Sequence, residues 1–149
     1  MDRRNVGGAV FANILIPTDG SAGASRGAEY GLDIAAKYGA TVHVLYVIDE
    51  AVRGETPGLS TDELAFERWE EEAEDAIDAV VERAEEVAVD VVTECVRGQP
   101  YRAILDYADA HDVDLIVMGL HGRSEIRRPL IGSTTNRVLR SAKVPVLPV

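Results

Sequence analysis

The chain has 149 residues, 46% of them hydrophobic and 28% charged, with a formal net charge of −11. This length and composition predict a single globular domain with a sizeable core. The acidic excess disfavours nucleic acid and anionic membranes as partners, and no apolar run approaches the ~20 residues that span a bilayer.

We expect residues 1–12 to form a short N-terminal tail and residues 13–149 to form the domain. Two arginines near the start are followed by only a few apolar residues, which is shorter than the ~7–15-residue core of a signal peptide. We therefore expect a cytoplasmic protein. The many acids and only two lysines also suggest, as a hypothesis, an acidic surface suited to a salt-rich cytoplasm, where screening relieves self-repulsion.

Cysteine and histidine contribute little to the predicted chemistry. Cys95 is the only cysteine, which excludes an intramolecular disulfide. It lies in the strand-like run Val91–Val96, so we expect it to be a small buried apolar residue. The three histidines are scattered along the sequence and predict no metal cluster.

The first half of the chain predicts two strands and two helices. An apolar run over residues 12–17 predicts a strand, and Ser21 is placed as the N-cap of a helix from Ala22 to about Tyr38, with Gly39 as its C-cap. Residues 41–48 predict a second strand, apolar on both faces towards its end. After a loop, Ser60–Glu63 has capping-box spacing and opens a helix to about Val87. Its apolar side includes Trp69, and its other side is rich in carboxylates.

The second half predicts three strands and two helices. Residues 89–96 and 114–118 predict strands, and a helix starts near Pro100, because proline is favoured in a first helical turn. A helix is expected from about Ser133 to Ser141. Residues 144–149 predict a last strand, whose two prolines place it at an edge or a bulge.

The alternation of these elements determines the predicted fold class. Strands that alternate with helices favour an α/β, doubly wound domain with a five-stranded parallel sheet and helices on both faces. Ligands of such sheets bind beyond the carboxyl ends of the strands. Two ends are unusual here: Pro17–Ser21 after the first strand, and the glycine-rich segment after the fourth.

Residues 118–135 form the most informative segment. Gly119, Gly122 and Gly132 are arranged as G-x2-G-x9-G-S between a strand and a helix, a context in which backbone N–H groups can approach an anion. Hydroxyl groups at residues 133–135 fall at the helix start. From His121 to Lys143 the chain has one acid and six bases, which favours a phosphate-type ligand over a solvated loop. The pattern is neither a Walker P-loop nor the G-x-G-x-x-G dinucleotide motif.

Asp19 follows the first predicted strand and has two readings. Its carboxylate could accept hydrogen bonds from a ribose or an adenine edge. It could instead bond its own backbone in an Asx-turn. The two readings are compatible, and both stay open.

Four segments resemble the universal stress protein family, and together the resemblance covers residues 13–149. They are Ile-Leu-Ile-Pro-Thr-Asp-Gly-Ser near the start, Val-Leu-Tyr-Val-Ile-Asp in the second strand, Leu-Ile-Val-Met-Gly-Leu-His-Gly-Arg through Ile-Gly-Ser-Thr-Thr, and the closing Val-Pro-Val-Leu-Pro-Val. The intact glycine array is similar to that of the ATP-binding branch. The resemblance implies an adenine nucleotide alpha-hydrolase-like fold and an ATP-binding regulatory protein of the stress response.

The resemblance also implies a role for each matching residue. Base and ribose contacts are implied along the first, second and fourth strands, and phosphate contacts along the glycine array. ATP is the implied cofactor, with ADP or AMP as alternatives and Mg or Mn as a bridging ion. The implied binding residues are Pro17, Thr18, Asp19, Val47, Met118, Gly119, His121, Gly122, Arg123, Gly132, Ser133 and Thr134.

Three functions remain in competition. The first is the nucleotide-dependent regulator, which would act on an unknown protein partner. The second is a slow ATP hydrolase or nucleotidyl transferase, disfavoured because no S-G-G-x-D-S loop follows the first strand and no positioned base or lysine is evident. The third is a nucleotide-free dimeric scaffold. The resemblance implies a homodimer formed through the last strand in each case.

Overall fold

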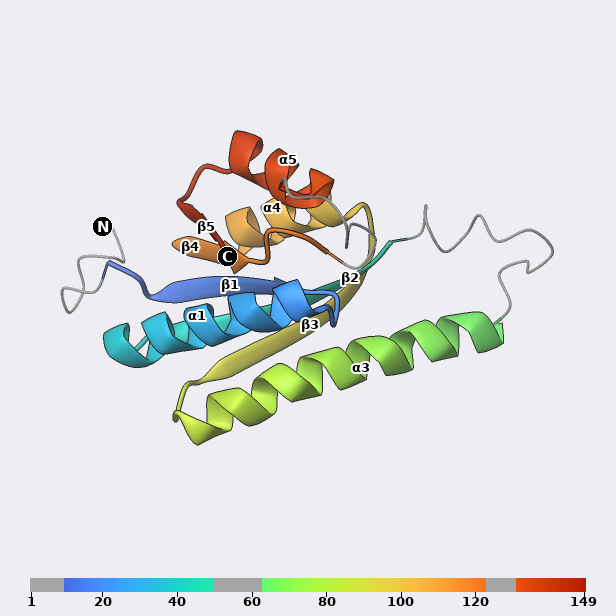
Figure 1. Cartoon of the computed structure of the whole chain (residues 1–149), viewed down its shortest axis with the longest axis horizontal. Coiled ribbons are helices and arrows are strands. Elements are labelled where there is room, and N and C mark those ends of the chain that lie inside the picture. The colour runs from blue at the N-terminus through green and yellow to red at the C-terminus, as the bar shows by residue number, and fades with distance from the viewer. Residues whose placement is uncertain (1–9, 50–62, 123–130) are drawn as a thin grey trace.

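The computed structural model describes residues 10–49, 63–122 and 131–149. Its five strands form one parallel sheet in the order β3-β2-β1-β4-β5. Helices α1 and α3 cover one face, and α4 and α5 cover the other (Figure 1). The predicted fold class is confirmed. The elements are β1 (Asn13–Thr18), α1 (Ala22–Tyr38), β2 (Thr41–Asp49), α3 (Glu63–Glu86), β3 (Val91–Gly98), α4 (Pro100–Ala110), β4 (Leu115–Met118), α5 (Ser133–Ser141) and β5 (Val146–Pro148).

The predicted boundaries are close to those observed. The starts of α1, β2, α4 and α5 are as expected, and β1, β3, β4 and β5 differ by one or two residues at their ends. The capping box at Ser60–Glu63 lies mostly outside the described residues. Among those residues, no helix is long and apolar enough to cross a membrane.

Two apolar clusters fill the spaces on either side of the sheet. Alternate residues of β1 and β2 point to opposite faces, and both sets are buried, because each face is covered by helices. Ile14, Ile16 and Val44 pack with α1 and α3, whereas Leu15 and Leu45 pack with α4 and α5. This sheet supports the strand ends from which the candidate site is built.

Helix α1 begins and ends with the caps expected from the sequence. The Ser21 hydroxyl accepts a hydrogen bond from the Ala24 N–H at 3.2 Å. Gly39 has the left-handed conformation, with φ of 68°, and its N–H bonds to the Ala35 carbonyl. The N-cap fixes the start of α1 directly after the turn that follows β1.

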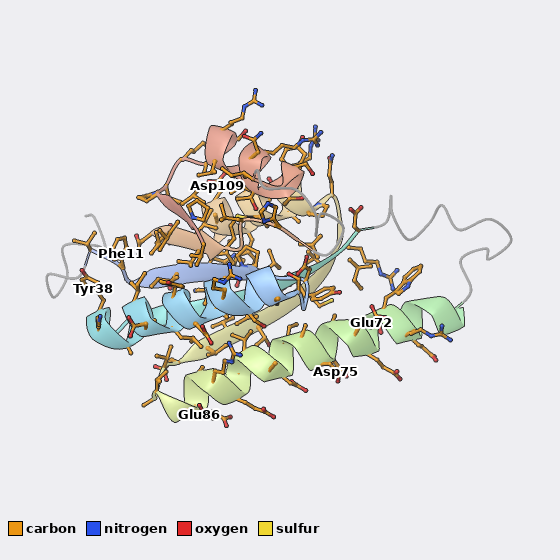
Figure 2. The ribbon with its side chains drawn as sticks, viewed as in Figure 1. Phe11, Tyr38, Glu72, Asp75, Glu86 and Asp109 are labelled. Carbon is orange, nitrogen blue, oxygen red and sulfur yellow. The ribbon has the colours of Figure 1, made fainter. Side chains whose placement is uncertain are left out.

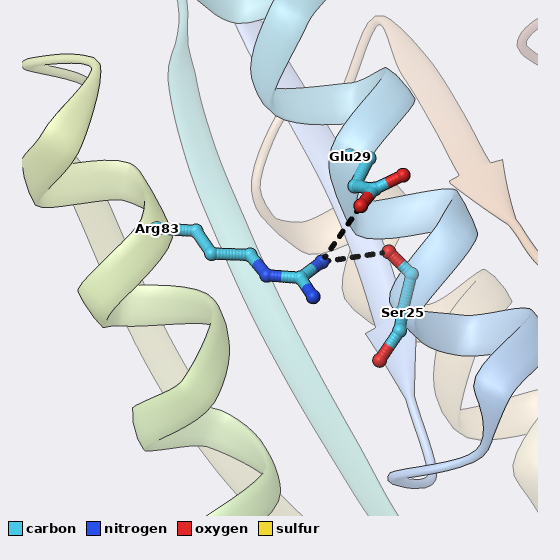
Figure 3. Close-up of polar contacts among 3 residues, drawn as sticks. All are labelled: Ser25, Glu29 and Arg83. Atoms are coloured by element: carbon cyan, nitrogen blue, oxygen red, sulfur yellow. Dashed lines mark hydrogen bonds and ion pairs between the residues drawn. The ribbon is translucent and has the colours of Figure 1, made fainter.

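Helix α3 packs beside α1 and carries much of the acidity. Arg83 reaches across to α1, where its Nη1 donates to the Ser25 carbonyl at 3.2 Å and lies 3.7 Å from Glu29 (Figure 3). Asp75 and Glu86 point away from the sheet (Figure 2). Trp69 packs against the core, as predicted. The acidic side of α3 is therefore a solvated face. The partly exposed ion pair between Arg83 and Glu29 lies on the side of α3 that faces α1.

The prediction that Cys95 is buried is wrong. Cys95 is exposed, because β3 is an edge strand that pairs only with β2 among the described strands. Partial burial is the main factor that raises the pKa of the Cys95 thiol, and the neighbouring Glu70 adds to this effect. A raised pKa disfavours the thiolate, the reactive form of cysteine.

A buried polar cluster lies between β2 and α4, at the amino end of the sheet. His43 is buried, its Nδ1 lies 2.7 Å from the Tyr107 hydroxyl, and its Nε2 lies 3.0 Å from the Asn13 side-chain oxygen. The Tyr107 ring stacks on His111 with centroids 3.8 Å apart. Because the amide oxygen can only accept, Nε2 of His43 donates to Asn13 and Nδ1 accepts from Tyr107. A neutral imidazole therefore has a hydrogen-bond partner at each of its two ring nitrogens.

We predict that acid destabilises the fold through His43. Burial, and secondarily the nearby His111, lower the pKa of His43 below its usual value of 6.5. As the pH falls below about 6.5, the unfolded chain takes up this proton before the folded chain does, so the free energy of unfolding decreases. Urea unfolding at pH 7.5 and pH 5 should show a larger loss for the wild type than for a non-titrating His43→Gln variant. An equal loss in both proteins would contradict the prediction.

Candidate functional site

A cavity of about 210 Å³ lies at the carboxyl ends of β1, β2 and β4, next to the first turns of α4 and α5. Eleven of the twelve site residues predicted from the sequence line it, and the twelfth, Arg123, lies outside the described residues. The structure thus brings together residues from distant parts of the sequence, and their contacts with a ligand remain predictions. The eleven are Pro17, Thr18, Asp19, Val47, Met118, Gly119, His121, Gly122, Gly132, Ser133 and Thr134.

The turn after β1 is held by its own side chains. The Asp19 Oδ1 accepts a hydrogen bond from the Ser21 N–H at 2.9 Å, and the Thr18 hydroxyl accepts from the Gly20 N–H at 3.2 Å. The predicted Asx-turn is therefore confirmed. The second oxygen, Oδ2, lies towards Gly122, only 2.8 Å from the place that a Cβ atom would take there. Asp19 thus connects the turn after β1 to the glycine array while it lines the cavity.

The segment after β4 runs against the backbone of α1. A Cβ atom on Gly119 would lie 2.5 Å from the Gly23 carbonyl carbon, and one on Gly23 would lie 2.5 Å from the His121 oxygen. Both distances are shorter than real Cβ contacts allow, so neither position accepts a side chain without movement of backbone. Glycine at both positions lets this segment approach α1 closely.

The two ends of the glycine array lie side by side, although nine residues separate Gly122 from Gly132 in sequence. The Gly132 N–H donates to the Leu120 carbonyl at 2.7 Å, and the buried Thr135 hydroxyl donates to the Gly119 carbonyl at 2.8 Å. Val149 flanks β4 and bonds to both Met118 and Leu120. These bonds bring all three glycines to one side of the cavity.

Helices α4 and α5 both start at the cavity without a side-chain cap. The N-cap residues are Gln99 and Gly132, and neither supplies a side-chain acceptor to the first turn. This differs from α1, which Ser21 caps. The partial positive charges of two helix N-termini are therefore directed at one cavity, an arrangement that favours an anionic ligand.

Part of the lining of the cavity is apolar. Leu45, Ile104 and Met118 line it from β2, α4 and β4, and all three are buried. Asp19 and Asp49 add carboxylates at the ends of β1 and β2. A cavity lined by apolar side chains, by carboxylates and by two helix N-termini fits a flat aromatic group joined to a phosphate.

Seven further residues line the cavity that sequence reasoning did not assign to the site. Asp49 could have been found, because it ends the strand that contains Val47. Pro100 and Ile104 were predicted only as helix residues, and the position of α4 beside the site depends on the strand order. The seven are Ala24, Leu45, Tyr46, Asp49, Pro100, Ile104 and Thr135.

Comparison with known proteins agrees with this architecture. The model of the universal stress protein family matches residues 11–149. Universal stress protein MJ0531 of Methanocaldococcus jannaschii is 36% identical over 94% of this chain and 82% of its own length. The solved structure of MJ0577 from the same organism has a TM-score of 0.81 at 29% identity, and covers 95% of this chain and 96% of its own.

A third relative carries a nucleotide. A universal stress protein solved in complex with cAMP has a TM-score of 0.67 at 26% identity, and the match covers 93% of this chain and 96% of that one. The family match spans nearly the whole chain, and the fold agrees with that of the solved relatives. The chain belongs to the universal stress protein family.

Proposed function

We propose that this chain binds an adenine nucleotide in the cavity, with ATP as the main ligand, and acts as a nucleotide-dependent regulator in the stress response. One observation carries the proposal: two helix N-termini without side-chain caps, three glycines and several buried apolar side chains line one cavity. The cAMP complex of a related universal stress protein supports the choice of nucleotide.

Each part of the ligand has a matching part of the cavity. The base lies between Val47 and Met118, and the Asp19 carboxylate accepts hydrogen bonds from the ribose. The backbone of the glycine array binds the phosphates, together with the hydroxyls of Ser133 and Thr134.

A divalent ion would accompany the phosphates. Groups of three or more His, Cys, Asp or Glu side chains able to hold a metal are absent from the described residues. Mg²⁺ is commonly bound by one or two carboxylates together with substrate phosphates. The carboxylates and hydroxyls that line the cavity fit an ion that arrives with the nucleotide, either Mg²⁺ or Mn²⁺. Such an ion would neutralise phosphate charge.

The proposed assembly is a homodimer through β5. This strand lies at one edge of the sheet, and its Leu147 is exposed. Pairing with a second β5 would cover an unpaired edge and that apolar side chain. A separate protein would be the partner of this dimer. Size-exclusion chromatography with light scattering should give the mass of two chains, and the mass of one chain would refute the dimer.

Titration calorimetry tests the binding proposal. Protein freed of ligand is titrated with ATP, ADP, AMP and GTP in the presence of Mg²⁺. We expect one adenine nucleotide per chain, weaker binding of GTP, and a melting temperature that rises with ATP concentration, because a ligand of the folded state stabilises it. Failure of all four nucleotides to bind would refute the proposal. Appearance of ADP or AMP from ATP would support a slow hydrolase instead.

A further inference from the structure

Two arginines gather around one tyrosine on the surface formed by α4 and α5. The Arg137 guanidinium carbon lies 5.0 Å from the centre of the Tyr101 ring. The Arg102 guanidinium carbon lies 6.0 Å from the same centre, and its Nε donates to the Tyr101 hydroxyl oxygen at 3.2 Å. We call these three residues the Tyr101 cluster. One aromatic ring thus holds two positive charges that would otherwise repel each other.

The Tyr101 cluster adjoins the cavity on both helices. On α4, Pro100 precedes Tyr101 and Ile104 follows it by three residues, and both line the cavity. On α5, Ser133 lines the cavity, and Arg137 lies four residues later, on the same side of the helix. The cluster therefore lies next to the residues of both helices that line the cavity.

The geometry of the cluster suits a phosphate. A guanidinium presents several N–H donors in one plane and binds phosphate in a bidentate manner. Stacking on Tyr101 restricts Arg137, so less conformational entropy is lost when an anion binds. The Arg102 hydrogen bond lowers the pKa of the Tyr101 hydroxyl, which agrees with a positive field at this position.

The positive charge of the Tyr101 cluster contrasts with the acidic character of the rest of the chain. The whole chain has a formal net charge of −11, yet the first turns of α4 and α5 contain no acidic residue. The N-termini of the same two helices add partial positive charge next to the cluster. An anion beside the first turns of α4 and α5 therefore has the positive charges of the cluster next to it.

We infer that the Tyr101 cluster binds the distal phosphates of a nucleoside triphosphate whose base occupies the cavity. This inference rests on the proposed nucleotide-binding function and adds a preference to it. The glycine array binds the phosphates nearest the ribose, and Arg102 and Arg137 bind the end of the chain. A triphosphate therefore binds more tightly than a monophosphate, because only the triphosphate reaches the cluster.

The test compares ATP with AMP in two matched double variants. Arg102→Gln/Arg137→Gln removes both guanidinium groups of the cluster. Arg140→Gln/Lys143→Gln removes the same number of charges from two exposed positions, one in the last turn of α5 and one just after the helix. Dissociation constants for ATP and AMP are measured by calorimetry for these variants and the wild type at one salt concentration. Urea unfolding checks that all three proteins are folded.

We expect the cluster variant to bind ATP about tenfold more weakly, because charge-assisted hydrogen bonds to phosphate are lost. Its AMP affinity should stay within about twofold of the wild type, and the control should stay within about twofold for both ligands. Equal weakening of ATP and AMP would overturn the inference in favour of a general field effect, and unchanged ATP affinity would overturn it outright. If the wild type binds no adenine nucleotide, the proposed function fails first and the inference fails with it.

Discussion

Replacing Gly119 with alanine is expected to destabilise the protein by about 3 kcal/mol or more. The added Cβ atom would lie 2.5 Å from the carbonyl carbon and 2.6 Å from the oxygen of Gly23, and 3.0 Å from the Ala24 nitrogen. All three atoms belong to the backbone of α1, so a side-chain rotation cannot relieve the collision. Either α1 or the segment after β4 must move, and both line the cavity.

Urea unfolding of the wild type and the variant measures this effect. Gly27→Ala is a control with a milder collision in the same region. Its Cβ atom would lie 3.2 Å from the Gly119 nitrogen and from the Met118 carbonyl carbon. That contact is tight but can be relieved by a small shift, so Gly27→Ala should cost less. A Gly119→Ala protein within 1 kcal/mol of the wild type would contradict the close packing of these two segments.

Gly122→Ala is expected to weaken nucleotide binding by at least about thirtyfold while it leaves stability nearly unchanged. The added methyl group would lie 2.8 Å from the Asp19 Oδ2 atom. This oxygen is at the end of a side chain, so it can move at little cost to the fold. The movement takes the carboxylate away from its place at the cavity and puts a methyl group beside it. Calorimetry with ATP measures the loss, and urea unfolding measures stability.

A double-mutant cycle separates this explanation from a general effect of the methyl group. In an Asp19→Ala background the carboxylate is absent, so the methyl group at residue 122 has nothing to displace. Gly122→Ala should then weaken ATP binding much less than it does in the wild type, since residues in contact have non-additive effects. Equal effects in both backgrounds would show that Gly122 acts independently of Asp19.

The sequence was sufficient to predict the strands and the approximate position of the site. Near-continuous apolar runs gave β1, β2 and β4, because strands covered on both faces need apolar residues at every position. Alternation with helices gave a parallel sheet, and parallel strands end at one edge. The positions of Asp19 and Gly119, each directly after a predicted strand, are therefore sufficient to place both residues at the same edge of the sheet.

Features that depend on strand order and edges could not be predicted. A cysteine in a strand-like run predicts a buried side chain, but Cys95 is exposed, because β3 is an edge strand with one unpaired side among the described strands. Ile104 lines the cavity because α4 packs beside α5, and no local pattern reports that contact. The pairing of Tyr101 with Arg137 also joins two helices that are distant in sequence.

Chemical identification of the ligand that copurifies with the protein tests the central claim most directly. Freshly purified protein is denatured, and the released small molecules are identified by chromatography and mass. The account predicts an adenine nucleotide, ATP foremost, close to one per chain, which is lost from the Gly122→Ala variant. No nucleotide in the released fraction, together with no binding when ATP and Mg²⁺ are added back, would contradict it and leave a nucleotide-free scaffold.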